Sequence, residues 1–262
     1  MSLRVAVLGC GPAGLAAAHA AAGLADEVHI YAPKRKTPQR GPIMLHRPIP
    51  GINNTQPDGY VRQIVIGGSI LDYRLRLYGD INIRINGDIL EEGFHTWRIP
   101  TAYDAMWEKY HELITDRAIA PDELDMMAKE YDLVVSTAPA PLLCMTPGWH
   151  EFRSVPIAIE LHSSYPNQPA NTVIYNSYGH IPWIRSSRIF EAEVTEYMPD
   201  DAPDTCVLIQ KPLSTDCTCH PRVLKTGRMG SWTNETWIDH AYYETRTALT
   251  SMLHKHEWDS VI

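Results

Sequence analysis

A glycine-rich segment close to the amino terminus constrains the fold of this chain more than any other feature. Gly9, Gly11 and Gly14 have GxGxxG spacing, and they follow a short β-branched run at residues 3–8. An Ala-rich stretch comes directly after them, and a second short strand pattern begins at Glu27. Strand, glycine turn, helix and strand within about thirty residues are typical of the opening unit of a doubly wound parallel sheet that binds a dinucleotide.

Each glycine has a physical role in such a unit. Gly9 permits the tight turn, Gly11 lets a pyrophosphate approach the backbone, and Gly14 lets helix and strand pack closely. Pro12 and Ala13 then open the helix, whose first N–H groups and partial positive charge favour a phosphate. We therefore predict that these five residues form the cofactor-binding turn, with the phosphates beside Gly11 and the start of the helix.

The end of the second strand lacks the acidic residue that usually binds the adenosine ribose. The sequence there reads Tyr31, Ala32 and Pro33, followed by three basic residues from Lys34 to Lys36. One interpretation is that the basic residues accept the 2′-phosphate of NADP. The other is that another group holds the ribose while the basic residues are solvated or attract an anionic ligand. Tyr31, Lys34 and Arg35 are candidate cofactor contacts.

Composition excludes several classes of protein. The chain has 262 residues, 44% of them hydrophobic, and a net charge of −8. Such a chain is globular, and its acidity argues against direct nucleic-acid binding. No apolar run reaches the ~20 residues of a membrane helix, and an odd set of five cysteines argues against a secreted disulfide framework. We expect a cytoplasmic protein with no membrane association and no room for a second dinucleotide domain.

The cysteines raise the question of a metal. Cys217, Cys219 and His220 form a CxCH cluster. Structural zinc sites usually combine such a pair with a second ligand pair, and the sequence gives no clear sign of one. We expect incidental thiols in a loop, and no metal site.

The order of the strand and helix patterns indicates an α/β protein with two regions. We predict a discontinuous dinucleotide-binding domain of Rossmann type, with a doubly wound parallel sheet. The substrate or cap region inserted into it is expected to be mostly antiparallel β. The predicted domain comprises residues 1–40, 119–146 and 220–262, and the inserted region comprises residues 41–118 and 147–219.

Three local predictions belong to this organisation. Residues 60–100, which include the alternating run YRLRLYG, are expected to form short antiparallel strands. Thr101 and Asp104 have capping-box spacing, which predicts a helix from Thr101. A closing helix is expected from about Asn234 to His254.

Three segments resemble the FAD-dependent oxidoreductase superfamily, in particular the amine oxidase and UDP-galactopyranose mutase flavoproteins. They are GCGPAGLAAAHAAA at residues 9–22, DLVVSTAPAP at residues 132–141 and LKTGRMGSWTNETWIDHAYYETRTAL at residues 224–249. The resemblance implies an FAD cofactor. It implies that the turn after the late strand and the Gly-Arg segment contact this cofactor, through Ala138, Pro139, Gly227, Arg228, Gly230, Ser231 and Trp232.

The Gly-Arg segment also makes physical sense beside a flavin. Gly227 and Gly230 allow backbone to approach a flat ring, and the helix near Asn234 would direct its positive end at a reduced flavin. Arg228 is either a fixed cation for phosphate or a flavin carbonyl, or one partner of a surface salt bridge. Trp232 either stacks on a ring or belongs to the core.

Two shorter segments resemble the mutase more weakly. Asn176 with the run Pro182–Arg185 resembles its Asn…Pro-Tyr-Thr-Arg segment, and the run Ile209–Pro212 resembles its Glu-Tyr-Pro segment. Trp183 and Ile184 stand where the mutase has Tyr and Thr, and the ribose acid is missing. The resemblance therefore implies the superfamily and not mutase activity.

The substrate side is predicted from a cluster of polar and aromatic residues. Tyr178, His180, Trp183 and Arg185 lie within eight residues. Arg185 would hold an anion, and His180 either transfers a proton or has a structural role. His46 is a further substrate candidate.

Charge is segregated along the chain. Residues 34–84 contain nine basic and three acidic residues, a net +6, so the remainder carries −14. This basic segment either receives an anionic substrate next to the cofactor or lines the solvated face of strands.

We therefore predict an FAD-dependent oxidoreductase that acts on a small or nucleotide-like anionic molecule. The superfamily favours oxidation of a C–N bond by hydride transfer to flavin N5. The alternatives are an NAD(P)-dependent reductase without flavin, a redox-neutral sugar-nucleotide mutase and a non-catalytic nucleotide-binding module. A homo-oligomer in which a partner subunit completes the site is compatible with this short chain.

Overall fold

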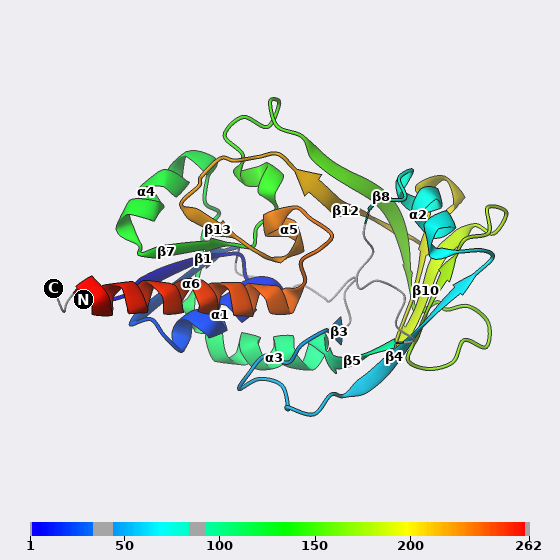
Figure 1. The fold of residues 1–262 in the computed structure, drawn as a ribbon, viewed down its shortest axis with the longest axis horizontal. Helices are drawn as coiled ribbons and strands as arrows, with labels where there is room; N and C mark the ends of the chain where they lie inside the picture. The colour runs from blue at the N-terminus through cyan, green and yellow to red at the C-terminus, as the bar shows by residue number, and fades with distance from the viewer. Residues whose placement is uncertain (1, 34–43, 84–92, 260–262) are drawn as a thin grey trace.

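A computed structural model describes residues 2–33, 44–83 and 93–259. The described chain forms two sheets, one parallel and one mostly antiparallel, which lie at opposite ends of the molecule (Figure 1). Lys34 and Arg35, predicted to contact the cofactor, lie outside the described residues.

The first sheet is parallel throughout and has the order β13-β7-β1-β2-β6. The chain runs outward through three strands and then returns to the other side of β1, so the strand order reverses between β1 and β7. Ligands of such sheets bind at this reversal, beyond the carboxyl ends of the strands. The prediction of a doubly wound parallel sheet is confirmed. Its strands are β1 (Arg4–Leu8), β2 (Glu27–Ala32), β6 (Ile114–Asp116), β7 (Leu133–Ser136) and β13 (Val223–Lys225).

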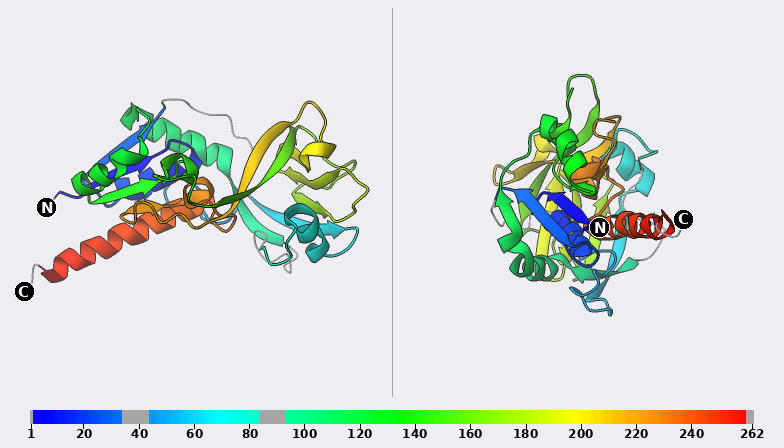
Figure 2. Two further views of the ribbon diagram at one scale, coloured as in Figure 1. Left: turned by 90° about the horizontal axis from the view of Figure 1, so that it is seen from above. Right: turned by 90° about the vertical axis from the view of Figure 1, so that its left-hand side faces the viewer.

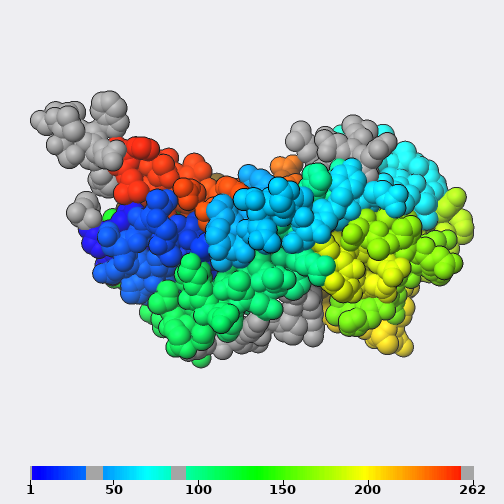
Figure 3. All heavy atoms as spheres, turned by 90° about the horizontal axis from the view of Figure 1, so that it is seen from below, coloured from blue at the N-terminus to red at the C-terminus, as the bar shows by residue number. Residues whose placement is uncertain are grey.

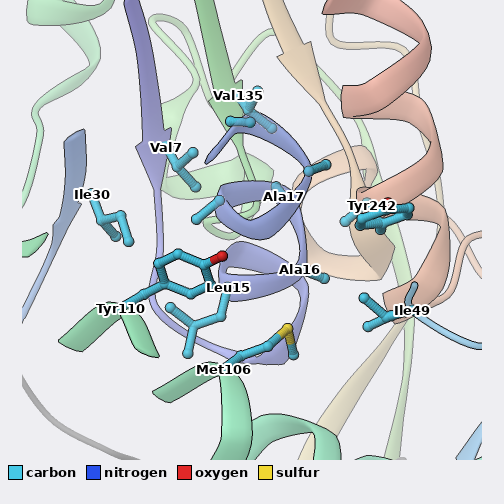
Figure 4. Packing of buried hydrophobic residues seen from close by; sticks show 14 of the residues in the cluster. Val7, Leu15, Ala16, Ala17, Ile30, Ile49, Met106, Tyr110, Val135 and Tyr242 are labelled. Carbon is cyan, nitrogen blue, oxygen red and sulfur yellow. The ribbon is translucent and has the colours of Figure 1, made fainter. Parts of the chain in front are cut away.

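Helices cover both faces of this sheet because side chains of β1 alternate between two cores. Val5 and Val7 face the core shared with α1 (Pro12–Ala22), α3 (Ile99–Tyr110) and α6 (Ile238–Asp259). Ala6 and Leu8 face the opposite core, which contains α4 (Leu124–Glu130). Figure 4 shows the first core, where α1 lies at the centre of the packed side chains. Its Ala residues allow the close approach of α6, which extends beyond the sheet (Figure 2).

The second sheet has eight strands in the order β12-β8-β11-β10-β9-β4-β5-β3. All neighbouring pairs are antiparallel except β4 and β9, which run parallel. This agrees with the predicted antiparallel β insert. The strands are β3 (Met44–Leu45), β4 (Gly59–Ile66), β5 (Gly93–Arg98), β8 (Phe152–Leu161), β9 (Thr172–Asn176), β10 (Trp183–Ile189), β11 (Ala192–Tyr197) and β12 (Val207–Thr215).

One expected strand is a helix. The run YRLRLYG belongs to α2 (Ile70–Tyr78), which packs on the second sheet through Tyr73 and Leu77. Ser69 and Asp72 form a capping box at its start, and Gly79 ends it with φ of +67°. These end signals and the four-residue spacing of the buried side chains outweigh the alternating pattern, so the prediction of a strand was wrong.

Two helix starts also differ from the prediction. α3 begins at Ile99 with Pro100 in its first turn, so the Thr101–Asp104 capping box is not used. α6 begins at Ile238 and not near Asn234, because a short helix, α5 (Gly227–Ser231), ends at Trp232 in a left-handed conformation with φ of +50°.

Residues 99–116 lie with the parallel sheet. They form α3 and β6, whereas the sequence pattern placed residues 41–118 in the inserted region. The remaining short helices are η1 (His111–Leu113), η2 (Pro121–Glu123), η3 (Ala140–Leu143) and η4 (Pro199–Asp201).

Two long strands connect the two sheets. β8 leaves the end of the parallel sheet after η3, and β12 returns beside it to β13 (Figure 1). In the space-filling view of Figure 3, the blue residues of β1, α1 and β2 lie at one end and the yellow residues of the second sheet at the other. Within the described ranges, no helix is long and apolar enough to span a membrane.

Candidate cofactor and substrate site

The glycine loop lies at the reversal of the parallel sheet and has the geometry expected of a phosphate-binding turn. Gly9 has φ of +110°, and its N–H donates to the carbonyl oxygen of Tyr31 at 3.0 Å. A Cβ on Gly14 would lie 2.0 Å from the Gly9 oxygen, so only glycine permits this helix–strand contact. A Cβ on Gly11 would meet no atom within 4 Å. The space beside Gly11, at the start of α1, is therefore open for a ligand to approach the backbone.

Thr137, which sequence reasoning missed, supports this loop from the end of β7. Its backbone N–H and its Oγ1 both donate to the carbonyl oxygen of Leu8, at 2.9 and 3.0 Å. The same Oγ1 would lie 2.6 Å from a Cβ on Gly9. Ala138 and Pro139 follow at this turn and are half-buried. The position of Thr137 directly after the buried strand was the available signal.

The Gly-Arg segment lies against the glycine loop. Gly227 has φ of +68°, and a Cβ there would lie 2.9 Å from the Cβ of Ala13 in the first turn of α1. A Cβ on Gly230 would lie 2.4 Å from the carbonyl oxygen of Ser136 at the end of β7. α5 therefore contacts the carboxyl end of the parallel sheet through backbone. Ser231 closes the helix through a bond from its Oγ to the Gly227 oxygen at 2.7 Å.

Several buried polar atoms near this segment have no hydrogen-bond partner among the described residues. Buried polar groups are normally paired, so these atoms suit a polar ligand that the chain itself does not supply. Together with the open space at Gly11, they fit a dinucleotide cofactor. The atoms are Ser136 Oγ, Trp232 Nε1, Trp237 Nε1 and Asp239 Oδ1.

A small cavity of about 20 Å³ lies where α5 meets the second sheet. Its lining is aromatic and cationic, and it includes Arg228 from α5 and Arg185 from β10. The lining residues are Tyr73, Tyr78, Arg185, Lys211, Pro212, Arg228 and Asn234.

One carboxylate holds two of these cations. Glu196 on β11, whose side chain is 3% exposed, bonds Arg185 Nη2 through one oxygen and Lys211 Nζ through the other. Arg185 Nε is buried and has no partner among the described residues. Arg228 also lines the cavity, so the charged side chains of its lining are all basic, which favours an anionic ligand.

Burial shifts the pKa values of these groups. Desolvation, followed by repulsion from Arg185, lowers the pKa of Lys211 to about 7, although Glu196 opposes this. Desolvation and then Arg185 also lower the pKa of Arg228. For Glu196, the adjacent Arg185 and Lys211 outweigh the opposing effect of desolvation, and the pKa is lowered. Lys211 is therefore the group here best suited to exchange a proton near neutral pH.

The predicted substrate cluster does not gather in the cavity. Arg185 lines it, but Tyr178, which is 41% exposed, and His180 lie on an exposed loop with their rings 5.2 Å apart. Trp183 contacts the ring of Tyr165 instead. Arg76 holds this loop, because its guanidinium donates to the carbonyl oxygens of Asn176, Ile181, Pro182 and Trp183.

His46 lies on the cofactor side and not with that loop. Its ring stacks on Trp237 with a centroid distance of 3.9 Å. Desolvation lowers its pKa to about 4, with Asp239 opposing and Arg228 adding to the shift. The neighbouring Arg47 pairs with the fully buried Asp239 at 2.9 Å. At neutral pH the His46 ring is therefore an uncharged group beside the Gly-Arg segment.

Two other residues predicted to contact the cofactor, Tyr31 and Trp232, contact side chains of the protein itself. The Tyr31 hydroxyl bonds the Tyr131 hydroxyl at 2.7 Å, on the α4 side of the sheet. Trp232 is buried and packs edge-to-face on Phe152, while its Nε1 has no partner among the described residues.

Sequence reasoning missed most of the cavity. Lys211 was named only within the short mutase-like run Ile209–Pro212, and Tyr73, Tyr78, Glu196 and Asn234 were not singled out as site residues. Their positions on α2, β11 and the segment after α5 gave no signal, because only the tertiary packing of these elements brings them together.

The structure also places two further residues beside the CxCH cluster. Cys144 and His150 approach Cys217 and Cys219, which we expected to be incidental thiols. His220 lies elsewhere, with Nδ1 on Asp125 Oδ1 at 2.9 Å and Nε2 on the Leu143 oxygen at 3.1 Å.

No protein-family model matches this sequence, and no curated protein matches it either.

Solved structures do match the fold. Reduced UDP-galactopyranose mutase aligns with 97% of this chain and 94% of its own, at 12% identity and a TM-score of 0.56. The tetrameric form of 2-methyl-3-hydroxypyridine-5-carboxylic acid oxygenase aligns with 95% of this chain and 81% of its own, at 12% identity and a TM-score of 0.55. A single-residue variant of Klebsiella pneumoniae HpxO, in complex with FAD, aligns with 95% of this chain and 80% of its own, at 11% identity and a TM-score of 0.54. The chain therefore shares the fold of these solved structures.

Proposed function

We propose that this protein binds FAD and is an FAD-dependent oxidoreductase whose substrate is a small anionic molecule. One observation carries the proposal: Arg228 belongs both to the α5 segment, which lies on the glycine loop, and to the cationic cavity beneath the second sheet. A cofactor that extends from Gly11 along α5 would therefore end beside the cavity.

The residues present divide between the two ends of such a cofactor. The open space at Gly11 and the first N–H groups of α1 would hold the pyrophosphate, as glycine loops of this type do. Gly227 and Gly230 let α5 pack against α1 and β7, and the Nε1 of Trp232 would face the flavin end. When bound, FAD supplies two-electron redox chemistry, with N5 as the hydride acceptor.

The cavity of about 20 Å³ has room for about one small polar group, so it would hold only the anionic end of a substrate, through charge. Arg185 Nε is a buried donor without a partner among the described residues, so an anionic group could accept its hydrogen bond while Glu196 keeps the guanidinium fixed. Lys211 would hold the same anion when protonated and could accept a proton when neutral, because its pKa lies near 7. The walls formed by Tyr73 and Tyr78 would limit water at the site.

A substrate with an oxidisable C–N bond is the finer proposal. The superfamily resemblance favours this reaction, and a neutral amine could be generated by transfer of its proton to Lys211. A nucleotide-linked amine would place its phosphate among the cations. A homo-oligomer is likewise part of the proposal.

Identification of the cofactor tests the main proposal. The protein is purified, denatured, and the released small molecules are identified by absorbance and mass. FAD in the supernatant, or stoichiometric uptake of added FAD, supports the proposal. A protein that binds NADP and not FAD would favour the flavin-free reductase.

The redox-neutral and non-catalytic alternatives need a second measurement. Bound flavin is mixed anaerobically with a panel of anionic amines, anionic alcohols and NAD(P)H, and its bleaching is followed. Bleaching by an amine supports C–N oxidation, whereas turnover only after prior reduction, without net oxidant use, indicates mutase-like chemistry. Bleaching by no compound favours a binding module.

A further inference from the structure

Four side chains that could bind a metal converge away from the cofactor and substrate site. The Sγ atoms of Cys144, Cys217 and Cys219 and the Nδ1 atom of His150 all lie within 4.8 Å of one another. Cys144 Sγ lies 3.1 Å from His150 Nδ1 and 3.9 Å from Cys219 Sγ, and Cys219 Sγ lies 3.8 Å from His150 Nδ1. Among the described residues this is the one group of its kind, and all three thiols are free.

The spacing suits a single tetrahedral ion. With Zn–S of about 2.3 Å and Zn–N of about 2.0 Å, a regular tetrahedron separates two sulfurs by about 3.8 Å and a sulfur from a nitrogen by about 3.5 Å. The three separations among Cys144, Cys219 and His150 lie within about 0.5 Å of these values. The Sγ atom of Cys217 lies within 4.8 Å of the other three donor atoms. Three thiolates and one imidazole form one of the usual donor sets of structural zinc.

The backbone holds the donors in place from both sides. The ladder of β8 and β12 ends at the pair Phe152 and Thr215, directly before the cluster. Beyond it, Thr215 Oγ1 donates to the Glu151 oxygen at 2.8 Å, and the Glu151 N–H donates to Asp216 Oδ1 at 2.7 Å. The Cys217 N–H donates to Thr215 Oγ1 at 3.1 Å, which sets the direction of the Cys217–Cys219 turn.

His220 holds the segments of Cys219 and Cys144 together, although it is not itself a metal-binding residue of the cluster. Both of its ring nitrogens are engaged, one by Asp125 and the other by the carbonyl oxygen of Leu143, the residue before Cys144. The buried His220 ring therefore ties the segment of Cys219 to the segment of Cys144. The second ligand pair that the CxCH motif lacks in sequence is supplied by the chain between η3 and β8.

We propose that Cys144, His150, Cys217 and Cys219 bind one Zn²⁺ ion as a closed structural site. Each thiol releases its proton to solvent as it becomes a ligand, and neutral His150 binds through Nδ1. Four protein ligands leave no open position for water or substrate, so the ion has no catalytic role.

The position of the site gives it a mechanical role. Cys144 and His150 lie on the connection that leaves the parallel sheet for β8, and Cys217 and Cys219 lie on the connection that returns from β12 to β13. A bound ion would join the two connections at the point where they pass between the sheets. It would thereby fix the orientation of the second sheet relative to the first, whatever cofactor the protein binds.

A disulfide is the competing use of these thiols. One disulfide would consume two of the three cysteines and leave a thiol and an imidazole beside it. Zinc uses all four donors, and the CxC spacing of Cys217 and Cys219 places both sulfurs toward one centre. The observations therefore favour the metal.

The test is metal analysis of the full-length protein, expressed with zinc in the medium and purified without a histidine tag or chelator. We expect about one zinc per chain by elemental mass spectrometry, and five reactive thiols after denaturation with chelator. Replacement by Co²⁺ should give intense visible bands of tetrahedral cobalt and near-ultraviolet thiolate charge-transfer bands.

Variants distinguish the four proposed metal ligands from a cysteine outside the cluster. Cys144→Ser, Cys217→Ser and Cys219→Ser should each lower bound zinc at least about tenfold after dialysis against a weak chelator. His150→Cys should retain zinc and increase the cobalt charge-transfer band, because a fourth thiolate replaces the imidazole. Cys206→Ser, which changes a cysteine outside the cluster in the loop before β12, should bind zinc like the wild type.

Three outcomes would overturn the proposal. They are absence of zinc and cobalt from folded wild-type protein, a stable disulfide among the three cysteines with only three reactive thiols, and wild-type zinc content in all the serine variants of the cluster. If a serine variant does not fold, the wild-type cobalt spectrum and His150→Cys still decide the matter.

Discussion

Lys211 Nζ and Glu196 Oε2 lie 2.5 Å apart, and both side chains are almost completely buried. Glu196 holds Arg185 with its other oxygen, so one carboxylate on β11 fixes cations from β10 and β12. This arrangement holds two basic side chains at the cavity wall in fixed positions, and both have the same acidic residue as their partner.

Replacement of that carboxylate should be strongly destabilising. Glu196→Gln would leave two buried cations without a counter-charge, and we expect a loss of about 3 kcal/mol in the free energy of unfolding. Urea denaturation measures this change. Glu191→Gln is the matched control, because Glu191 pairs with Arg98 at 2.7 Å but is 76% exposed, and it should cost less than about 1 kcal/mol. Equal costs for the two variants would contradict a structural role for the buried network.

Anion binding should weaken as pH rises through about 7. The pKa of Lys211 lies near this value, so its positive charge is present below pH 7 and is lost above it. Sulfate, whose charge is constant across this range, is the probe, and calorimetry of the FAD-loaded protein is the measurement. Lys211→Met should weaken sulfate binding about tenfold at about pH 6, the worth of one charge-assisted bond, and should remove the pH dependence. Lys129→Met, at an exposed position on α4, should change neither the sulfate affinity nor its pH dependence. If sulfate binding by Lys211→Met still depended on pH, the pH dependence would belong to another group.

A methyl group at the glycine loop should impair cofactor binding with little effect on folding. Gly11→Ala places a Cβ in the open space beside α1, so we expect FAD affinity to fall at least about tenfold, or about 1.4 kcal/mol. The change at the helix N-cap should cost under about 1 kcal/mol of stability. Gly179→Ala, which also meets no atom within 4 Å, should leave FAD affinity unchanged. Fluorescence titration with FAD compares the variants, and wild-type affinity in Gly11→Ala would show that the phosphates bind elsewhere.

Acid should destabilise the folded state through His46. Its pKa is about 4 in the folded protein, against an ordinary value of 6.5, so the unfolded chain takes up a proton first. This contribution to stability is therefore complete above pH 6.5 and is lost as pH falls toward 4, by at most about 3 kcal/mol. His46→Phe, which keeps a ring against Trp237, should lose less stability between about pH 7 and pH 4 than the wild type. His180→Gln on the exposed loop should behave like the wild type in the same denaturation series.

Short sequence motifs predicted those parts of the fold that neighbouring residues determine. The glycine loop, the β1–α1–β2 unit and the buried strand β7 each carry their own turn or end signal within a few residues. The same reasoning failed for α2, because an alternating pattern over seven residues does not distinguish a strand from a short helix. There, the capping box at Ser69 and the left-handed Gly79 decided the structure.

The sequence by itself determined that this chain builds a parallel sheet with a dinucleotide-binding turn, because glycine spacing and strand–helix alternation act over a few residues. Only the tertiary structure decided which side chains share a site. Lys211 meets Glu196 across 15 residues of chain, and Cys144 meets Cys219 across 75. Those meetings follow from the pairing of β8 with β12 and with β11, and strand pairing over such distances leaves no local pattern in the sequence.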